Sequence, residues 1–357
     1  MDIEIRYLTS GSAVLMPIVA AAGTGTPTTG AMAHTGAAAP ASGAPGVDTA
    51  LLEVPGGYLE WSVLAMDRLP HAVLDDVGRA QDWLWAVYGE QVALAVAGRS
   101  GRAHAHPAQP ALLDAARGLA YAVWAQRWWP ASSIDAIPAL DPGELARDVA
   151  RLGAACDPLV DEPLETDVVA PQRASEYALA AGTQTAAAPA ALVLARGVGG
   201  TDWRCYPPGL IDASEQAVSW ELVRAAGSTS VFVRVAAAPG LAGEVPEHLR
   251  PWAFGRGAGV APIQLGLVAD EWIGIAPLDA PTGDDAPRAT TAATTEIDPT
   301  ATDFGFDIAV PGFGTRPAAA DAAAAALRAR IRAFVRTRLD GAPDLLGAEI
   351  AAAASDF

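Results

Sequence analysis

Residues 217–238 read AVSWELVRAAGSTSVFVRVAAA, and this stretch decides the fold class of the second half of the chain. Two apolar runs, Ala217–Arg224 and Thr229–Ala238, flank a short segment that contains Gly227. Runs rich in Val, Phe and Trp on either side of a Gly-containing turn are typical of a β-hairpin. The stretch therefore predicts two paired antiparallel strands.

The same pattern continues along the chain. Ala261–Val268 and Glu271–Leu278 flank the dipeptide Ala269–Asp270, and Phe304–Phe313 ends the series. Short apolar runs separated by turns are typical of antiparallel β structure. We therefore predict a β-rich, sandwich-like domain over residues 188–315.

The first half shows the period of helices instead. Proline residues bound Ala111–Trp129, and Asp141 followed by Pro142 has the pattern of a helix start. We predict short strands at 1–22 and 47–56 and a helical domain over 57–156. The fold class is α+β, with a helical N-terminal half and an antiparallel β-sandwich-like C-terminal half closed by an amphipathic helix.

Composition and hydrophobic pattern assign the remaining segments to a loop, a linker, a helix and a tail. Residues 23–46 are rich in Gly, Ala, Thr, Pro and Ser and are expected to form a disordered loop, because they bury too little apolar surface to offset their ordering entropy. Residues 157–187 are acidic and irregular and are interpreted as a linker. An amphipathic helix is predicted over 316–340, followed by a frayed tail over 341–357.

Amino-acid usage argues against several enzyme classes. All 23 basic residues are arginine, and asparagine is absent as well, which indicates a bacterial genome of high GC content. A P-loop needs a lysine, as do Schiff-base enzymes, protein kinases and Ser-Lys β-lactamases. The absence of lysine therefore disfavours all four classes.

The net charge of −18 limits the partners further. Phosphate contacts need clustered cations, so we expect no general nucleic-acid binding. The N-terminus is acidic where a signal peptide is basic, and the apolar run Ala13–Ala22 is too short to cross a membrane. We expect a cytoplasmic acidic protein without a membrane span, whose Cys156 and Cys205 are structural thiols.

One loop concentrates basic and imidazole groups. Between Gly98 and Pro110 the chain carries Arg99, Arg102, His104 and His106. A His-x-His pair on a strand places both rings on one face, which suits a metal, and the arginines suit an anion. No third ligand is evident, so a solvated loop is the main interpretation, and we expect no metal and no cofactor.

Two helices are candidates for partner binding. The segment from Arg316 to Arg338 has six arginines and one acidic residue, a local charge of +5 on an acidic chain. The partner-binding candidates are Arg328, Arg330, Arg332, Arg336, Arg338 and, on the earlier aromatic helix, Tyr121, Trp124 and Trp128. Alternatively, the arginines contact the chain's own acidic surface, and the aromatic residues form a core.

These features favour a non-catalytic interaction or scaffold subunit of a bacterial multi-protein system, whose partners are other subunits or a second copy. Two alternatives stay open. One is a hydrolase-type enzyme with a site near the His104/His106 loop, because a catalytic triad is defined by geometry and not by spacing. The other is a small-ligand sensor with a Trp-lined pocket.

Overall fold

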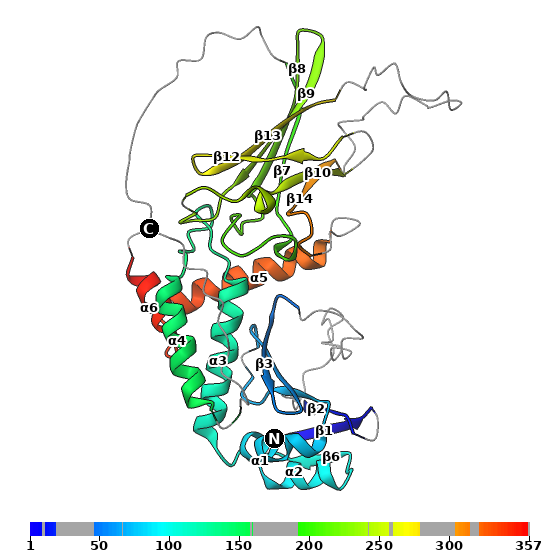
Figure 1. Ribbon diagram of the computed structural model, residues 1–357, viewed down its shortest axis with the longest axis vertical. Helices are drawn as coiled ribbons and strands as arrows, with labels where there is room; N and C mark the ends of the chain where they lie inside the picture. The colour runs from blue at the N-terminus through cyan, green and yellow to red at the C-terminus, as the bar shows by residue number, and fades with distance from the viewer. Residues whose placement is uncertain are drawn as a thin grey trace, which may run out of the picture. The chain divides into compact units, whose positions relative to one another are not determined.

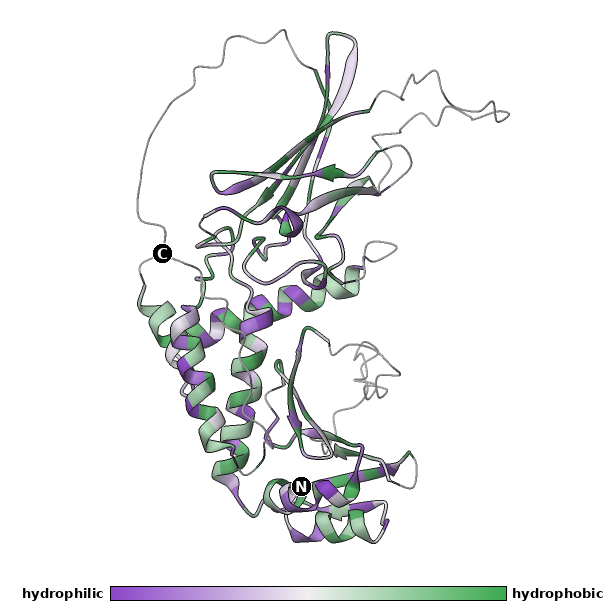
Figure 2. Ribbon diagram, viewed as in Figure 1, coloured by the Kyte–Doolittle hydropathy of each residue, from purple (hydrophilic) through white to green (hydrophobic). Residues whose placement is uncertain are grey.

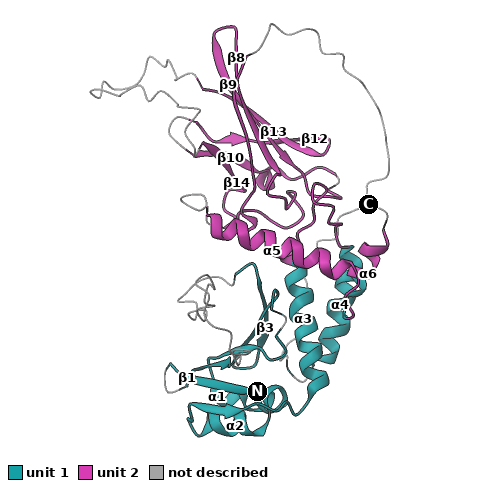
Figure 3. Cartoon of the chain, turned by 180° about the vertical axis from the view of Figure 1, so that it is seen from behind, with its two compact units in different colours: residues 1–126, 141–168, 344–348 teal, residues 127–140, 169–343, 349–357 magenta. Residues whose placement is uncertain are grey.

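The computed structural model describes residues 1–8, 11–18, 46–65, 67–157, 159, 192–241, 243–256, 260–278, 304–314 and 321–355. The chain divides into two compact units (Figure 3). Unit 1 comprises Met1–Gln126, Asp141–Val168 and Asp344–Ala348, and unit 2 comprises Arg127–Leu140, Val169–Pro343 and Glu349–Phe357. Most of the predicted loop at 23–46 and of the predicted linker at 157–187 lies outside the described residues.

Unit 1 contains a six-stranded antiparallel sheet with the order β3-β4-β5-β2-β1-β6 (Figure 1). Its strands are β1 (Asp2–Tyr7), β2 (Ala13–Pro17), β3 (Thr49–Val54), β4 (Gly57–Ser62), β5 (His71–Leu74) and β6 (Arg102–His104). Alternate residues point to one side, where Ile3, Leu15 and Leu59 are fully buried. That side of the sheet is the core of unit 1.

Strands β4 and β5 show that the prediction of a helical domain beginning at residue 57 was wrong. Leu59 and Val63 have helical spacing, but Leu59 and Trp61 also alternate with polar neighbours and are both buried. Gly56 has a φ of 76°, which L side chains rarely adopt, and it makes the tight turn between β3 and β4. The local spacing fits a helix and a strand equally well, and pairing with β3 and β5 makes this segment a strand.

The helices before residue 157 are α1 (Val77–Tyr88), α2 (Glu90–Ala97), α3 (Pro110–Trp128) and α4 (Pro142–Ala155). The predictions for α3 and for the start of α4 are confirmed, because Asp141 caps α4 by accepting a hydrogen bond from the Glu144 N–H at 2.8 Å. Two tryptophan N–H groups fix helices in unit 1: Trp83 on α1 donates to the Pro55 carbonyl and Trp124 on α3 to the Val47 carbonyl.

Unit 2 contains two antiparallel sheets. The larger has the order β12-β13-β9-β8-β7 and the smaller the order β11-β10-β14 (Figure 1). Their strands are β7 (Leu192–Gly199), β8 (Val218–Ala225), β9 (Ser228–Ala236), β10 (Trp252–Arg256), β11 (Ile263–Gln264), β12 (Gly266–Val268), β13 (Glu271–Pro277) and β14 (Gly305–Ala309). Short 3₁₀ helices occur at Trp203–Cys205 and Glu247–Leu249.

The hairpin predicted from residues 217–238 is confirmed. Strands β8 and β9 pair along their length, and Ala226 and Gly227 both have positive φ in the turn between them. The second predicted hairpin, β12–β13, turns at Ala269 with a φ of 56°. The α+β class is therefore confirmed, with strands in both halves of the chain.

Two helices follow the sheets. Helix α5 (Ala322–Leu339) corresponds to the predicted amphipathic helix and buries Ile331 and Val335 completely. Helix α6 (Gly347–Ala354) lies where a frayed tail was expected, and it buries Ala348 and Glu349 completely. Among the described residues, no helix is long and apolar enough to span a membrane.

Candidate functional site

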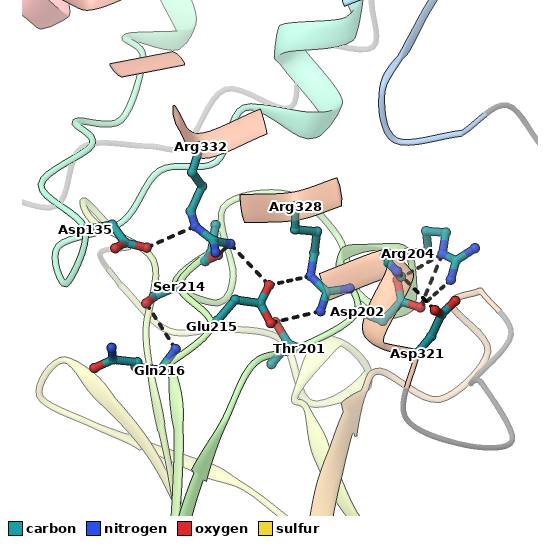
Figure 4. Close-up of polar contacts among 12 residues, drawn as sticks. Asp135, Thr201, Asp202, Arg204, Ser214, Glu215, Gln216, Asp321, Arg328 and Arg332 are labelled. Atoms are coloured by element: carbon teal, nitrogen blue, oxygen red, sulfur yellow. Dashed lines mark hydrogen bonds and ion pairs between the residues drawn. The ribbon is translucent and has the colours of Figure 1, made fainter. Parts of the chain in front are cut away.

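Helix α5 presents its arginines to carboxylates of unit 2 (Figure 4). Arg328 donates two hydrogen bonds to Glu215, at 2.7 and 3.0 Å. Arg332 donates to Glu215 and to the Ala213 carbonyl, and its Nε lies 3.1 Å from an Asp135 oxygen. Both arginines are buried, while Glu215 and Asp135 keep 28% and 24% of their side-chain surface exposed.

The remaining arginines of α5 divide into two groups. Arg336 binds Asp135 at 2.9 Å, and the buried Arg338 forms two hydrogen bonds of 2.8 Å with Glu349. Arg330 is exposed and forms no ion pair with any residue that the structure describes. Four of the five candidate arginines therefore have partners inside unit 2. Partner binding by this set stays a prediction, and Arg330 is its most accessible member.

The carboxylates that receive these arginines lie in irregular segments. A Cβ on Gly200 would overlap the Glu215 carboxylate, so Gly200 leaves the space that this side chain occupies. Nearby, the fully buried Asp212 accepts hydrogen bonds from Ser132, Ser133 and the Ser214 N–H. Sequence reasoning missed these acids because a single carboxylate in a loop leaves no periodic signal.

A second ion pair lies close by in Figure 4. Arg204 contacts both carboxylate oxygens of Asp202, at 2.6 to 3.2 Å. Burial of Asp202 acts to raise the pKa of its carboxyl, but hydrogen bonds from the side chain and backbone of Arg204 outweigh burial and lower that pKa. The carboxyl of Asp202 therefore stays ionised, and the cluster has the character of a structural network.

The aromatic candidates on α3 lie mostly inside. Tyr121 and Trp124 are buried and stacked, with ring centroids 5.4 Å apart. Trp128 is half-buried, and the Arg127 guanidinium lies 4.7 Å from its ring centroid. Tyr121 and Trp124 thus contribute to packing, which agrees with the alternative that the aromatic stripe is core.

The basic and imidazole side chains of the loop between Gly98 and Pro110 do not gather at one site. His104 Nδ1 lies 2.9 Å from Asp2 Oδ1, and this hydrogen bond is the main cause of the lowered pKa of Asp2. The Arg99 guanidinium lies 4.6 Å from the Tyr7 ring centroid, while Arg102 and His106 are exposed. Within the described ranges, no group of three His, Cys, Asp or Glu side chains is arranged to hold a metal ion.

A Trp-lined hollow of about 280 Å³ does occur in unit 1. Trp83 and Trp85 of α1 line it together with Leu112 of α3, and the exposed Asp82 contributes a carboxylate. Pockets for drug-sized ligands have volumes of roughly 300–1,000 Å³. The hollow is thus at the lower limit for a small ligand, and the sensor hypothesis stays a prediction.

A different surface stands out in unit 2. The side of the larger sheet that faces away from the buried Trp220 and Trp272 is here named the outer sheet face. It includes Val193, Arg196, Val198, Ser219, Glu221, Val223, Phe232, Arg234, Val268, Ile273 and Ile275, and the polar residues Ser228, Ser230 and Glu271 also lie on it. An antiparallel sheet with one face in water normally shows polar residues on that face. Here Val, Ile or Phe stands at seven outward positions, and Figure 2 shows hydrophobic residues along the strands of this sheet.

These apolar side chains are accessible. Val198 is 65% exposed, Val193 49% and Ile275 58%. Of twelve large hydrophobic side chains exposed among the described residues, four lie on the outer sheet face, and two more, Leu192 and Leu194, lie on β7 beside it. Clustering of this kind marks interaction surfaces, whereas singly scattered apolar residues need no explanation.

A hollow of about 410 Å³ lies on the outer sheet face over β7, β8 and β9. Phe232, Val198 and Ser219 line it, and Arg196 and Arg234 add two guanidinium groups. Strand register places Ile275, Phe232, Glu221 and Arg196 side by side in one row across four strands. The hollow therefore combines an aromatic ring, aliphatic side chains and charges of both signs.

Among the described strands, β7 is at the edge of this sheet and pairs only with β8. Its register with β8 shifts between Val193 and Ala195, so the pairing is irregular there. Bulges and edge charges such as Arg196 protect a sheet edge against further strand pairing. The arrangement therefore favours contact across the face over the addition of a strand at the edge.

No family model, curated protein or solved structure matches this chain.

Proposed function

We propose that this chain is a non-catalytic interaction subunit of a multi-protein system and that the outer sheet face of unit 2 is its interface. The apolar exposure of that face carries the proposal. Val198 and Ile275 are each more than half exposed, on a face where an antiparallel sheet in water normally has polar side chains. The proposal thus moves the interface from the arginines of α5 to the sheet.

The ion pairs of α5 support this change. A guanidinium that already has a carboxylate in its own unit must break that pair before it can bind another protein, and breaking a buried pair costs several kcal/mol. Arg332 and Arg338 are in this position.

The proposal also treats the two sheets of unit 2 as a sandwich. The contact between Trp220 and Phe304, whose ring centroids lie 4.7 Å apart, supports this arrangement.

The two alternatives rest on fewer observations. The hydrolase hypothesis has only the histidine loop, where His104 binds Asp2. The sensor hypothesis has the small hollow beside Trp85, of about 280 Å³. Neither feature brings a nucleophile together with a base, nor several polar groups aimed into an enclosed space.

The test uses the full chain, tagged and expressed in its native cell. Wild-type protein in the extract is expected to elute from a size-exclusion column in a complex larger than the free chain. Ile275→Asp and Val198→Asp place charges on the outer sheet face and are expected to shift the elution toward that of the free chain. The matched control is Leu94→Asp, since Leu94 is 64% exposed on α2 of unit 1.

Two results would contradict the proposal. One is an elution position that neither substitution on the outer sheet face changes. The other is an equal change in the Leu94→Asp control, which would show that any added surface charge breaks the complex. Deletion of residues 316–357 is a poorer test than these substitutions, because it removes the buried Ile331 and Val335 from unit 2.

A further inference from the structure

The charges of the outer sheet face have both signs. Arg196 and Arg234 stand on β7 and β9, and Glu221 stands on β8 between them. None of the three forms an ion pair with another residue in the described parts of the chain, although Arg196 and Glu221 are directly opposite across the strands. A surface that neutralises this face must offer carboxylate and guanidinium groups together with apolar side chains.

The outer sheet face itself has this composition. Glu221 is directly opposite Phe232, and Arg234 follows Phe232 by two residues on the same strand, so Arg234 and Glu221 are diagonal neighbours. A two-fold axis that runs parallel to the sheet, between the two copies, and crosses the line from Arg234 to Glu221 at its midpoint and at a right angle places Arg234 of each copy over Glu221 of the other. Such an isologous contact satisfies two ion pairs at once.

Long-range charge adds a second argument. Each copy has a net charge of −18, so two copies repel one another at most orientations. A contact between copies is favoured at a surface that is apolar and nearly neutral. The hollow has two arginines and one glutamate among Val198, Ser219 and Phe232, and so fits that requirement.

We propose that the occupant of the outer sheet face is a second copy of this chain, which binds through the same face in a two-fold symmetric contact. This inference rests on the proposed function of that face as an interface. Phe232 and Ile275 of each copy cover the apolar part of the other, and Arg234 of each copy meets Glu221 of the other.

The experiment measures the mass of the purified full-length chain by sedimentation equilibrium at about 1–100 µM, a range that resolves dissociation constants of that order. Wild-type protein is expected to be a dimer. Arg234→Glu and Glu221→Arg each create two like-charge contacts and are expected to weaken the dimer at least about tenfold. Circular dichroism checks that both variants are folded.

A mixture of the two variants gives the decisive result. In a heterodimer of Arg234→Glu with Glu221→Arg, every contact again joins opposite charges, so the dimer mass is expected to return. Arg330→Glu tests the earlier binding candidate on α5. Arg68→Glu is the matched control, because Arg68 is exposed between β4 and β5 of unit 1 and is not part of the outer sheet face. It is expected to leave the dimer unchanged.

Three outcomes would overturn the inference: a monomeric wild-type chain, single variants that dimerise like wild type, or a mixture that stays monomeric. A dimer lost only in Arg330→Glu would place self-association on α5 instead. A monomeric purified chain, combined with loss of the complex in extracts of the Ile275→Asp strain, would leave the proposed function standing with a different protein as partner.

Discussion

The two large sheets of this protein distribute polar and apolar side chains in opposite ways. The six-stranded sheet of unit 1 turns charged or polar side chains outward on five of its strands, among them Glu4, Glu53, Glu60 and Arg102. The larger sheet of unit 2 turns Val, Ile and Phe outward. The first arrangement is typical of a sheet face in water, and the second is typical of a face that another surface covers.

The interiors of the two units differ in the opposite way, because unit 2 has more buried charged side chains than unit 1 among the described residues. Unit 2 buries ionised side chains, including Arg332, Arg338 and Glu349, while the buried charged residue of unit 1 in the described segments is Asp148. Buried ion pairs rarely add net stability, although they fix geometry because each partner is costly to leave alone. We infer that buried ion pairs fix the position of α5 in unit 2. The outer sheet face of the same unit exposes apolar side chains.

The largest expected effect tests the buried charges of unit 2. Glu349→Ala leaves Arg338 without its carboxylate partner in a site where the two side chains are 5% and 0% exposed. Breaking such a pair costs about 3–5 kcal/mol. Urea unfolding followed by tryptophan fluorescence measures the loss. Glu271→Ala, at an exposed position on β13, is the control and should change stability by less than about 0.5 kcal/mol. Equal effects of the two would contradict a structural role for the buried pair.

A smaller effect tests how the larger sheet packs on its inner side. A Cβ on Gly197 would lie 2.6 Å from the Trp220 ring, so Gly197→Ala forces the indole to move and changes its contact with Phe304. Overpacking of this kind costs about 1–3 kcal/mol. Gly199→Ala on the same strand is the matched control, because no atom lies within 4 Å of its added Cβ.

Thermal unfolding compares the two glycine variants, and the tryptophan emission spectrum, to which all ten tryptophans contribute, adds a second readout. The expected result is a lower midpoint and a changed spectrum for Gly197→Ala alone. If Gly199→Ala destabilised the protein as much, then the loss would come from β7 backbone flexibility and not from the contact with Trp220.

Sequence reasoning succeeded where local pattern and tertiary structure agree. The hairpin around Gly227 and helix α3 were predicted because turn residues and prolines mark their ends. It failed at β4, where Leu59 and Val63 fit a helix as well as a strand, and at the tail, where α6 is held by burial of Glu349. Whether a segment becomes a helix or a strand at these places depends on contacts with residues that are distant in sequence. A single sequence does not show which distant residues come into contact.

The candidate site was less predictable than the fold. The excess of arginine on α5 was visible, but its partners lie far away: Glu215 is 117 residues from Arg332, and the carbonyl that Arg336 binds is 201 residues away, at Asp135. The outer sheet face did leave a signal, because the run Val231–Phe232–Val233 is apolar on both sides of β9. A strand with one face in water would alternate there.

A pH-dependent effect compares one carboxylate from each unit, the largely buried Asp202 of unit 2 and the exposed Asp2 of unit 1. The pKa of Asp202 is lowered in the folded protein, since Arg204 outweighs burial, so its ionised form contributes stability above the unfolded pKa of about 3.9. That contribution is lost as pH falls through the lower folded pKa. Asp202→Asn should remove it, and the loss at neutral pH should be at most about 1 kcal/mol, because Arg204 is half exposed.

Asp2 of unit 1 provides the comparison, because its pKa is also lowered, mainly by a hydrogen bond with His104, but it is fully exposed. Stability measured by urea unfolding between pH 7 and about pH 3 should fall less steeply for Asp202→Asn than for wild type. Asp2→Asn should follow the wild-type curve. A steeper acid limb for Asp202→Asn would show that the sign of its pKa shift is wrong.

The smallest expected effect on stability is at the outer sheet face. Ile275→Ala removes a side chain that is 58% exposed, so the free energy of unfolding should change by less than about 0.5 kcal/mol. The same substitution at Ile3, which is fully buried on β1 of unit 1, should cost about 2–5 kcal/mol. Measurements belong at low protein concentration, because association with another copy adds to the apparent stability. A loss above about 1 kcal/mol for Ile275→Ala in the dilute protein would mean that the chain covers this face itself, and the contrast between the two sheets would then lose its functional meaning.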